Sequence, residues 1–159
     1  MHTIIKKQIA TAQLSKVVER MVKKLMEPFL EQTVAYGPNQ FAYRAKRGAR
    51  DALALLTLEW IAQINRRGKI ALYASDVAGA FDRVDSSILL DKLEAKGLNG
   101  KLRRLIISWL QTRRATIIIG GSCSVEFALQ NMVFQGTVLG PCLWNAFFED
   151  ARTAINTSK

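Results

Sequence analysis

The sequence predicts an α+β domain in which long helices pack on a small, mainly antiparallel sheet. Three observations support this fold class. Apolar residues recur at helical spacing over much of the chain, an apolar run at residues 69–75 has the length of a strand, and a glycine pair at residues 120–121 separates two β-rich stretches. The chain has 159 residues, of which 49% are hydrophobic, so it can form one core, and two independent domains are not expected.

The N-terminal part of the chain is predicted to contain two helices. Residues 11–28 alternate basic and apolar side chains at helical spacing, and Thr11 or Ser15 is the candidate N-cap. Residues 51–67 form the second predicted helix, which is long and apolar. It is expected to end at Arg67, because Gly68 suits the position just past a helix C-terminus. We expect the basic side chains of the first helix to be mostly solvent-exposed.

An apolar run at residues 69–75 follows directly and ends at Asp76. Both alternating faces of this run are apolar, which is typical of a strand at the buried centre of a sheet. An ionised carboxylate there is costly unless a positive group compensates it. A divalent metal ion would compensate it in phosphate chemistry. Alternatively, Asp76 caps the next turn or pairs with Arg83, and the run alone leaves both interpretations open.

Two more helices and a hairpin are predicted in the second half of the chain. The helices cover residues 86–97, with a serine N-cap, and residues 98–112. Residues 115–129 are predicted to form a hairpin, because the turn residues Gly120 and Gly121 both tolerate positive φ.

Composition excludes several classes of function. No run of about 18 apolar residues exists, so no membrane span is expected. The spacing of Cys123 and Cys142 fits neither a disulfide framework nor a zinc site, and both are predicted to be buried thiols in a reducing compartment. His2 is the only histidine, so histidine-based catalysis or metal binding is not expected.

The formal net charge of +10 predicts binding to a polyanion. Residues 1–50 carry ten Lys and Arg against three Glu, whereas the rest of the chain carries thirteen basic residues against ten acidic ones. The neighbouring aromatic residues Phe41 and Tyr43 could stack on nucleotides or, equally, anchor the core. The basic residues that we single out as a nucleic-acid-binding cluster are Arg44, Lys46, Arg47 and Arg50.

A glycine-containing loop runs into a helix at residues 134–150, where Pro141 suits the first helical turn. This segment and residues 73–85 resemble motifs B and A of a reverse transcriptase, most closely the enzymes of non-LTR (LINE-type) retrotransposons. Each motif alone is a weak signal, whereas five in the family's order are a strong one. The other three similar segments are residues 14–20 (Leu-Ser-Lys-Val-Val-Glu-Arg), 37–52 and 109–114.

The resemblance implies RNA-directed DNA synthesis by two-metal nucleotidyl transfer, with an RNA template, a DNA primer and dNTPs as partners. Asp76 matches the family's catalytic metal ligand, and the backbone carbonyl of Val77 matches a second ligand. The implied metal is Mg²⁺, with Mn²⁺ as the alternative. Phe81 matches the steric gate that rejects a ribose 2′-hydroxyl, although a core aromatic would otherwise be the preferred interpretation. Gln135 and Gly136 match residues of the nucleotide pocket.

The resemblance also implies a partial palm-and-fingers domain. Residues 1–68 would be a helical, fingers-like segment, and residues 69–159 a palm-like segment. The family's Ala-Asp-Asp motif is missing before Lys159, so we expect a fragment of a longer polymerase that is inactive alone. Asp82 and Asp85 would have structural or capping roles.

Two alternatives to a catalytic fragment stay open. One is a non-catalytic nucleic-acid-binding remnant, which would need no metal, and the other is a truncated retroelement product without activity. For the catalytic fragment as for the alternatives, the life cycle of such elements implies an intracellular location, in a nuclear or cytoplasmic ribonucleoprotein, and no membrane partner.

Overall fold

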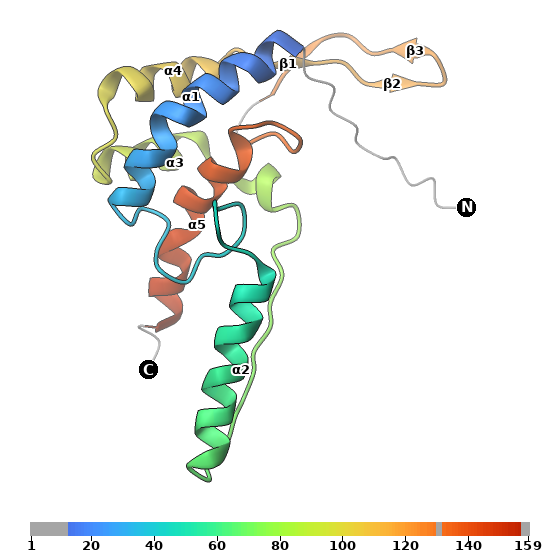
Figure 1. Ribbon diagram of the computed structural model, residues 1–159. Helices are drawn as coiled ribbons and strands as arrows, with labels where there is room; N and C mark the ends of the chain where they lie inside the picture. The colour runs from blue at the N-terminus through green and yellow to red at the C-terminus, as the bar shows by residue number, and fades with distance from the viewer. Residues whose placement is uncertain (1–12, 130–131, 157–159) are drawn as a thin grey trace.

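The computed structural model describes residues 13–129 and 132–156, with side chains as far as Ala151, and it confirms the predicted α+β class. Helices α1, α3, α4 and α5 form a bundle, whereas α2 and the hairpin project from it (Figure 1). The helices are α1 (Gln13–Gln32), α2 (Ala49–Asn65), α3 (Ser86–Ala95), α4 (Gly100–Gln111) and α5 (Gly140–Asn156), with a 3-10 helix η1 (Ala80–Arg83). The strands are β1 (Arg114–Ala115), β2 (Ile118–Ile119), β3 (Ser122–Cys123) and β4 (Phe127–Ala128).

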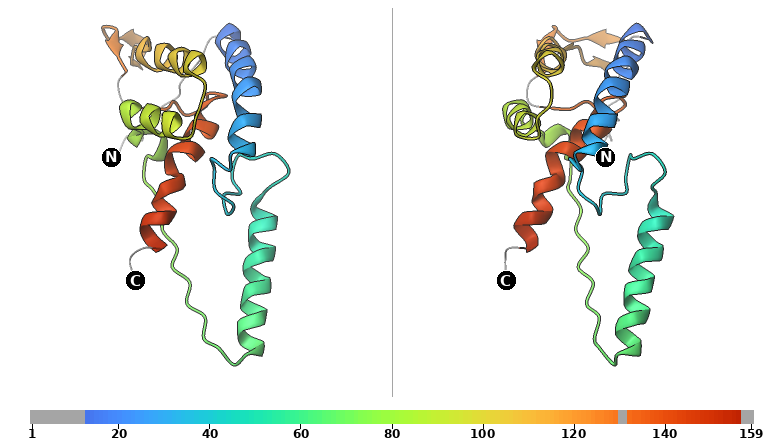
Figure 2. Two further views of the ribbon diagram at one scale, coloured as in Figure 1. Left: turned by 90° about the vertical axis from the view of Figure 1, so that its left-hand side faces the viewer. Right: turned by 60° about the vertical axis from the view of Figure 1, so that its left-hand side comes forward.

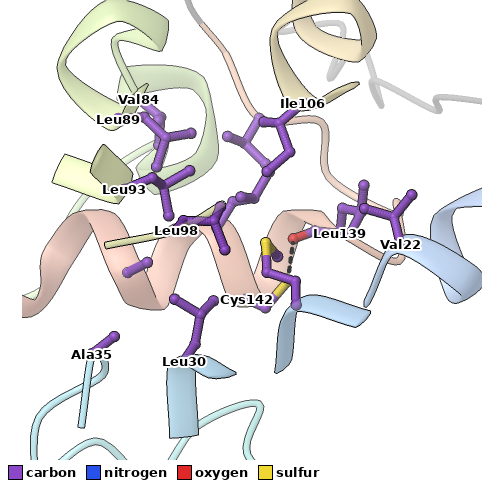
Figure 3. Packing of buried hydrophobic residues seen from close by; sticks show 14 of the residues in the cluster. Val22, Leu30, Ala35, Val84, Leu89, Leu93, Leu98, Ile106, Leu139 and Cys142 are labelled. Atoms are coloured by element: carbon purple, nitrogen blue, oxygen red, sulfur yellow. Dashed lines mark hydrogen bonds between the residues drawn. The ribbon is translucent and has the colours of Figure 1, made fainter. Parts of the chain in front are cut away.

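The core of the bundle lies between its four helices. Helix α3 packs on both α4 and α5, and α5 also contacts α1 and η1. Figure 3 shows apolar side chains from the packed elements converging on one cluster. In this cluster the thiol of Cys142 lies 3.0 Å from the carbonyl oxygen of Leu139. The aliphatic side chains of the core that have no exposed surface are Met26, Leu30, Val84, Leu89, Leu93, Ile106, Val133 and Leu143.

Helix α1 is longer than predicted, because it continues for one turn beyond Pro28. Proline removes one backbone donor and strains the preceding turn, but Leu30 is fully buried in the core and holds the last turn in place. The helix ends at Gln32, and two residues further on Val34 has a φ of +54°, which lets the amide of Ala35 donate to the carbonyl of Leu30 at 2.9 Å. Of the two candidate caps, Thr11 lies outside the described residues, and Ser15 lies within the helix.

The second predicted helix is confirmed as α2, with one correction at its C-terminus. The residue in the left-handed conformation is Arg67, with φ of +55°, and Gly68 follows it. The amide of Gly68 donates to the carbonyl of Gln63 at 2.8 Å, which closes the helix. At the N-terminus, the Asp51 carboxylate accepts from the amide of Gly48 at 2.7 Å.

Helix α3 is capped by Asp85, and the predicted serine N-cap is therefore wrong. The Asp85 carboxylate accepts hydrogen bonds from the amides of Ser87 and Ile88 at 2.8 and 3.1 Å. These bonds, with that from the Ser87 hydroxyl as the largest cause, lower the pKa of Asp85. A carboxylate is favoured at this position because it satisfies otherwise unpaired amides.

The hairpin prediction is confirmed. Strand β2 pairs antiparallel with β3, β1 pairs with β4, and the chain reverses through Gly120 and Gly121 at φ of +58° and +84°. The hairpin projects away from the bundle (Figure 1). Cys123 lies on it and is exposed, which corrects the predicted buried thiol, whereas Cys142 is buried as predicted.

The predicted buried strand at residues 69–75 is wrong. Residues 68–77 are extended but exposed, and no described residue pairs with them in a ladder. An apolar run becomes a central strand only when neighbouring strands bond its backbone and cover both faces. This segment and α2, which has no buried residue, project together from the bundle as an arm (Figure 2). None of the described helices is long and apolar enough to cross a membrane.

Candidate functional site

Asp76 lies at the end of the arm, where the extended segment re-enters the bundle. Both Asp76 and Val77 are exposed, and within the described residues the Asp76 carboxylate makes no hydrogen bond or ion pair. The alternative interpretation of an Asp76–Arg83 pair is not observed, since the Arg83 guanidinium donates to the carbonyl of Ala78 at 2.8 Å. Both oxygens of Asp76 are therefore open to a ligand.

Phe81 lies five residues further on, in η1, and is held between two aromatic side chains. Its ring packs edge-on against Tyr43 at 6.3 Å between centroids and is tilted against Trp144 at 5.9 Å. The backbone of the same residue accepts a hydrogen bond from the amide of Val133 at 2.9 Å. Phe81 is half-buried at the edge of the core, so one part of its ring packs inward and the other part reaches solvent.

Phe81 and Gln135 line the same open pocket, although they are 54 positions apart in the sequence (81 to 135). Gly79, Ala80 and Asp82 complete this pocket. The structure therefore brings together two of the residues that the sequence predicted to contact a nucleotide.

Gly136 follows Gln135 at the tip of the loop that leads into α5. Its φ of +87° is one that residues with a side chain rarely adopt. A Cβ built on Gly136 would have no atom within 4 Å, so the space beside its backbone is open. The loop can therefore be approached closely from solvent at this position.

The base of this loop is tied to the first turn of α5. The Thr137 hydroxyl donates to the carbonyl of Phe134 at 2.7 Å and accepts from the amide of Gly140 at 3.1 Å. Pro141 lies in the first turn of α5, as predicted. Residues 133–139, which we call the Gln135 loop, are therefore rigidly joined to the helix that follows.

Glu19 of α1 also binds this loop and was not singled out from the sequence. Its side chain is 1% exposed, and one carboxylate oxygen accepts from the amide of Val138 at 2.6 Å. The other oxygen accepts from Arg113 at 3.2 Å. A signal existed, because helical spacing puts Glu19 on the same face as the buried residues Val22 and Met26.

Asn145 of α5 is a second polar residue that the sequence analysis missed. It is buried, and it joins α5 to the segment that leads to Tyr43. Its side-chain oxygen accepts from Gln40 at 2.6 Å, and its side-chain amide donates to the carbonyl of Ala42 at 2.9 Å. These bonds position Tyr43 beside Phe81.

The predicted basic cluster divides into one structural and three exposed residues. Arg44 forms a salt bridge with Glu31 and donates to the carbonyl of Gly37 at 2.8 Å. The hydrogen bond from Arg44 is the largest cause of a lowered pKa at Glu31. The side chains of Lys46, Arg47 and Arg50 are exposed, and Arg47 lies over the ring of Phe41 at 5.9 Å.

In the part of the chain that the structure describes, carboxylates that could bind a metal ion do not lie in groups. Residues 13–129 and 132–156 contain no group of three or more His, Cys, Asp or Glu side chains that could hold a metal ion. Asp85 is used as a helix cap. Asp76 keeps its oxygens available, and one carboxylate with a backbone carbonyl is a partial ligand set of the kind that Mg²⁺ accepts.

Comparison with known proteins gives consistent matches. The chain is 30% identical over 142 residues to the RNA-directed DNA polymerase from mobile element jockey of Drosophila melanogaster, and 25% identical over 139 residues to the probable RNA-directed DNA polymerase from transposon BS of the same fly. It is 28% identical over 104 residues to the Pol polyprotein from type-1 retrotransposable element R2 of Popillia japonica. These matches cover 88%, 87% and 64% of the chain.

The chain spans about 15% of the length of the jockey and BS proteins and 17% of the R2 protein. These relatives confirm the resemblance to non-LTR retrotransposon enzymes that the motifs indicated. A sequence profile described as reverse transcriptase (RNA-dependent DNA polymerase) matches residues 6–159. The chain therefore belongs to the reverse transcriptase family.

Proposed function

We propose that this chain contributes the nucleotide pocket and one metal ligand to an RNA-directed DNA polymerase of a retrotransposon. The observation that carries the proposal is the pocket shared by Phe81 and Gln135, whose lining begins at Gly79, three residues after Asp76 in the sequence (76 to 79). Membership of the family supports the reaction, since its members use divalent metal ions and copy RNA into DNA. An RNA template, a DNA primer and dNTPs are the proposed partners, and a nuclear or cytoplasmic ribonucleoprotein is the proposed location.

Asp76 and the carbonyl of Val77 are the groups that we propose as ligands of Mg²⁺, with Mn²⁺ as the alternative. The ion would supply activation of the attacking hydroxyl and stabilisation of charge on the phosphates. The exposure of Asp76 supports this role, because an incoming triphosphate can reach its carboxylate without any rearrangement of the core.

Phe81 is proposed to select deoxynucleotides. A flat ring at the wall of the pocket excludes a ribose 2′-hydroxyl only if the ring cannot move aside. Tyr43 and Trp144 support the ring of Phe81 from two sides, which restricts that movement. Gln135 and Gly136 would contact the nucleotide from the opposite wall, where the absence of a Cβ at Gly136 lets the backbone approach.

The exposed cations Lys46, Arg47 and Arg50 are proposed to attract the phosphates of the template and primer. They need no metal, so they equally favour the alternative function, a nucleic-acid-binding module without catalysis. The proximity of Arg47 to the ring of Phe41 suits stacking on a base in either case.

Template–primer binding in the presence of Mg²⁺ and the complementary dNTP distinguishes the two functions. An assembled nucleotide pocket should tighten binding of an RNA–DNA duplex when both ligands are added, and Asp76→Asn should abolish that tightening. The matched control is Asp91→Asn, which removes the same charge from an exposed position on α3. Binding that is tight but insensitive to dNTP would favour the non-catalytic module.

Primer extension measures the chemistry itself. We expect the 159-residue chain to extend a primer on RNA very slowly, because the described residues offer isolated carboxylates where the two-metal reaction uses several. A product that depends on Asp76 and appears at a rate typical of polymerases would contradict this expectation.

A further inference from the structure

An ion pair between the buried Glu19 and the partly buried Arg113 joins three segments that are far apart in the sequence. Glu19 lies in α1, and Arg113 follows α4 directly before the hairpin. The Arg113 guanidinium donates to a carboxylate oxygen of Glu19 at 3.2 Å, and the Ser15 hydroxyl donates to the same oxygen at 3.2 Å. The third segment is the Gln135 loop, which both residues contact.

Glu19 holds the C-terminal side of the Gln135 loop. Its second carboxylate oxygen accepts from the amides of Val138 and Leu139 at 2.6 and 3.4 Å. These amides directly precede α5, so the carboxylate also lies at the positive end of the helix dipole. An ionised carboxylate is costly to bury unless it is paired and hydrogen-bonded, and here the donors come from three segments.

Arg113 holds the N-terminal side of the same loop. Its guanidinium lies 4.8 Å from the ring centroid of Phe134 and 4.0 Å from that of Trp109. Phe134 is fully buried and is the residue immediately before Gln135. Burial, as the largest cause, lowers the pKa of Arg113, while its hydrogen bond to Glu19 opposes that shift.

We propose that Glu19 and Arg113 are positioning residues that fix both sides of the Gln135 loop and so set where Gln135 meets a nucleotide. The inference rests on the proposed function in that it assigns the nucleotide contact to Gln135. Neither residue lines the pocket, so both act through the loop. The ion pair contacts the two ends of the loop, whereas its tip at Gln135 and Gly136 is exposed.

Amide hydrogen exchange tests the positioning directly. Glu19→Gln keeps the shape of the side chain but removes the charge that three segments share. We expect exchange in residues 135–140 to accelerate at least about tenfold relative to residues 86–95 of α3, because hydrogen bonds to a charged group are strong. Referring the rates to α3 separates loosening of the loop from a loss of stability of the whole bundle.

Glu27→Gln is the matched control, since it makes the same change on the same helix. Glu27 pairs with Lys23 at 3.5 Å and does not contact the loop. It should leave the ratio of exchange rates unchanged. Arg113→Lys should also loosen the loop, because an ammonium cannot reproduce the stacked, planar contact with Phe134 and Trp109. Two outcomes would overturn the proposal. One is an equal acceleration of amide exchange in the loop and in α3, and the other is unchanged exchange in the loop of both variants, Glu19→Gln and Arg113→Lys.

The affinity for dNTP and Mg²⁺, measured with template–primer bound, tests the functional consequence. Glu19→Gln should weaken dNTP binding about tenfold and leave the affinity for the template–primer unchanged, which a purely structural role would not do. A loosened loop with unchanged dNTP affinity would overturn the positioning role. If the unsubstituted chain binds no dNTP, the proposed function fails, while the exchange experiment still decides whether the two residues hold the loop.

Discussion

The bundle and the arm both carry many apolar side chains but bury them to opposite degrees. Leu93 in α3 has no exposed surface, whereas Leu58 in α2 keeps 63% of its surface exposed. The arm also carries Leu72 and Tyr73 on an extended backbone that no described residue pairs with. Apolar patterning therefore indicates which residues gain from burial, whereas the presence of a partner segment decides whether they are buried.

Truncation of one leucine in each region should give the largest difference between the bundle and the arm. Leu93→Ala should lower the free energy of unfolding by about 2–5 kcal/mol, because it leaves a cavity in a packed core. Leu58→Ala should change it by less than about 0.5 kcal/mol, since an exposed side chain loses little on truncation. Denaturant unfolding of both variants measures the difference. Similar losses for the two would show that the arm is packed in solution.

The connection between the two regions should have an intermediate effect. Asn145→Ala removes the acceptor of Gln40 and the donor to Ala42, and it leaves buried polar groups unsatisfied. We expect a loss of about 1–3 kcal/mol in the free energy of unfolding. Thermal unfolding followed by Trp fluorescence would measure this loss. Asn65→Ala, at the exposed end of α2, is the control and should be close to neutral.

The smallest effect is expected at Glu31, where the chain leaves the bundle. Its folded-state pKa is lowered by Arg44, so the pair stabilises the fold above the unfolded pKa of about 4.5. That contribution is lost as the pH falls through the still lower folded pKa. Because Glu31 is largely solvent-screened, we expect less than about 1 kcal/mol.

Unfolding measured between pH 6 and pH 3 (a range of about 1.5 units on either side of 4.5) would reveal this contribution. Glu31→Gln should flatten that part of the pH dependence. Glu126→Gln, which removes an exposed partner of Arg114 on the hairpin, should leave it unchanged. A pH dependence that is identical in all three proteins would contradict the assignment to Glu31.

Local signals in the sequence predicted much of the fold. The helices α1 to α5 and the turn at Gly120 and Gly121 follow from spacing and from backbone preferences, which are properties of neighbouring residues. The extension of α1 past Pro28 was missed, because it depends on burial of Leu30. Residue preferences alone favoured a serine as the cap of α3, whereas the family resemblance gave Asp85 a structural or capping role, and Asp85 is the cap.

The candidate site was predictable only for residues to which the family resemblance assigns a role. The sequence pointed to Phe81 and Gln135, and the structure brings both to one pocket. Glu19, Arg113 and Asn145 were missed because their partners are about a hundred positions away. The strand expected at residues 69–75 failed for the same reason, since its burial depends on segments elsewhere in the fold.

The exposed backbone of the arm has a consequence for handling the isolated chain. An extended, apolar segment whose amides and carbonyls pair with no described strand is a template for aggregation by edge-to-edge association. The net charge of +10 opposes that association through mutual repulsion between molecules. Added salt screens this repulsion over distances of about 10 Å at 0.1 M. The same salt that strips nucleic acid from the basic surface during purification would therefore also promote aggregation through the arm.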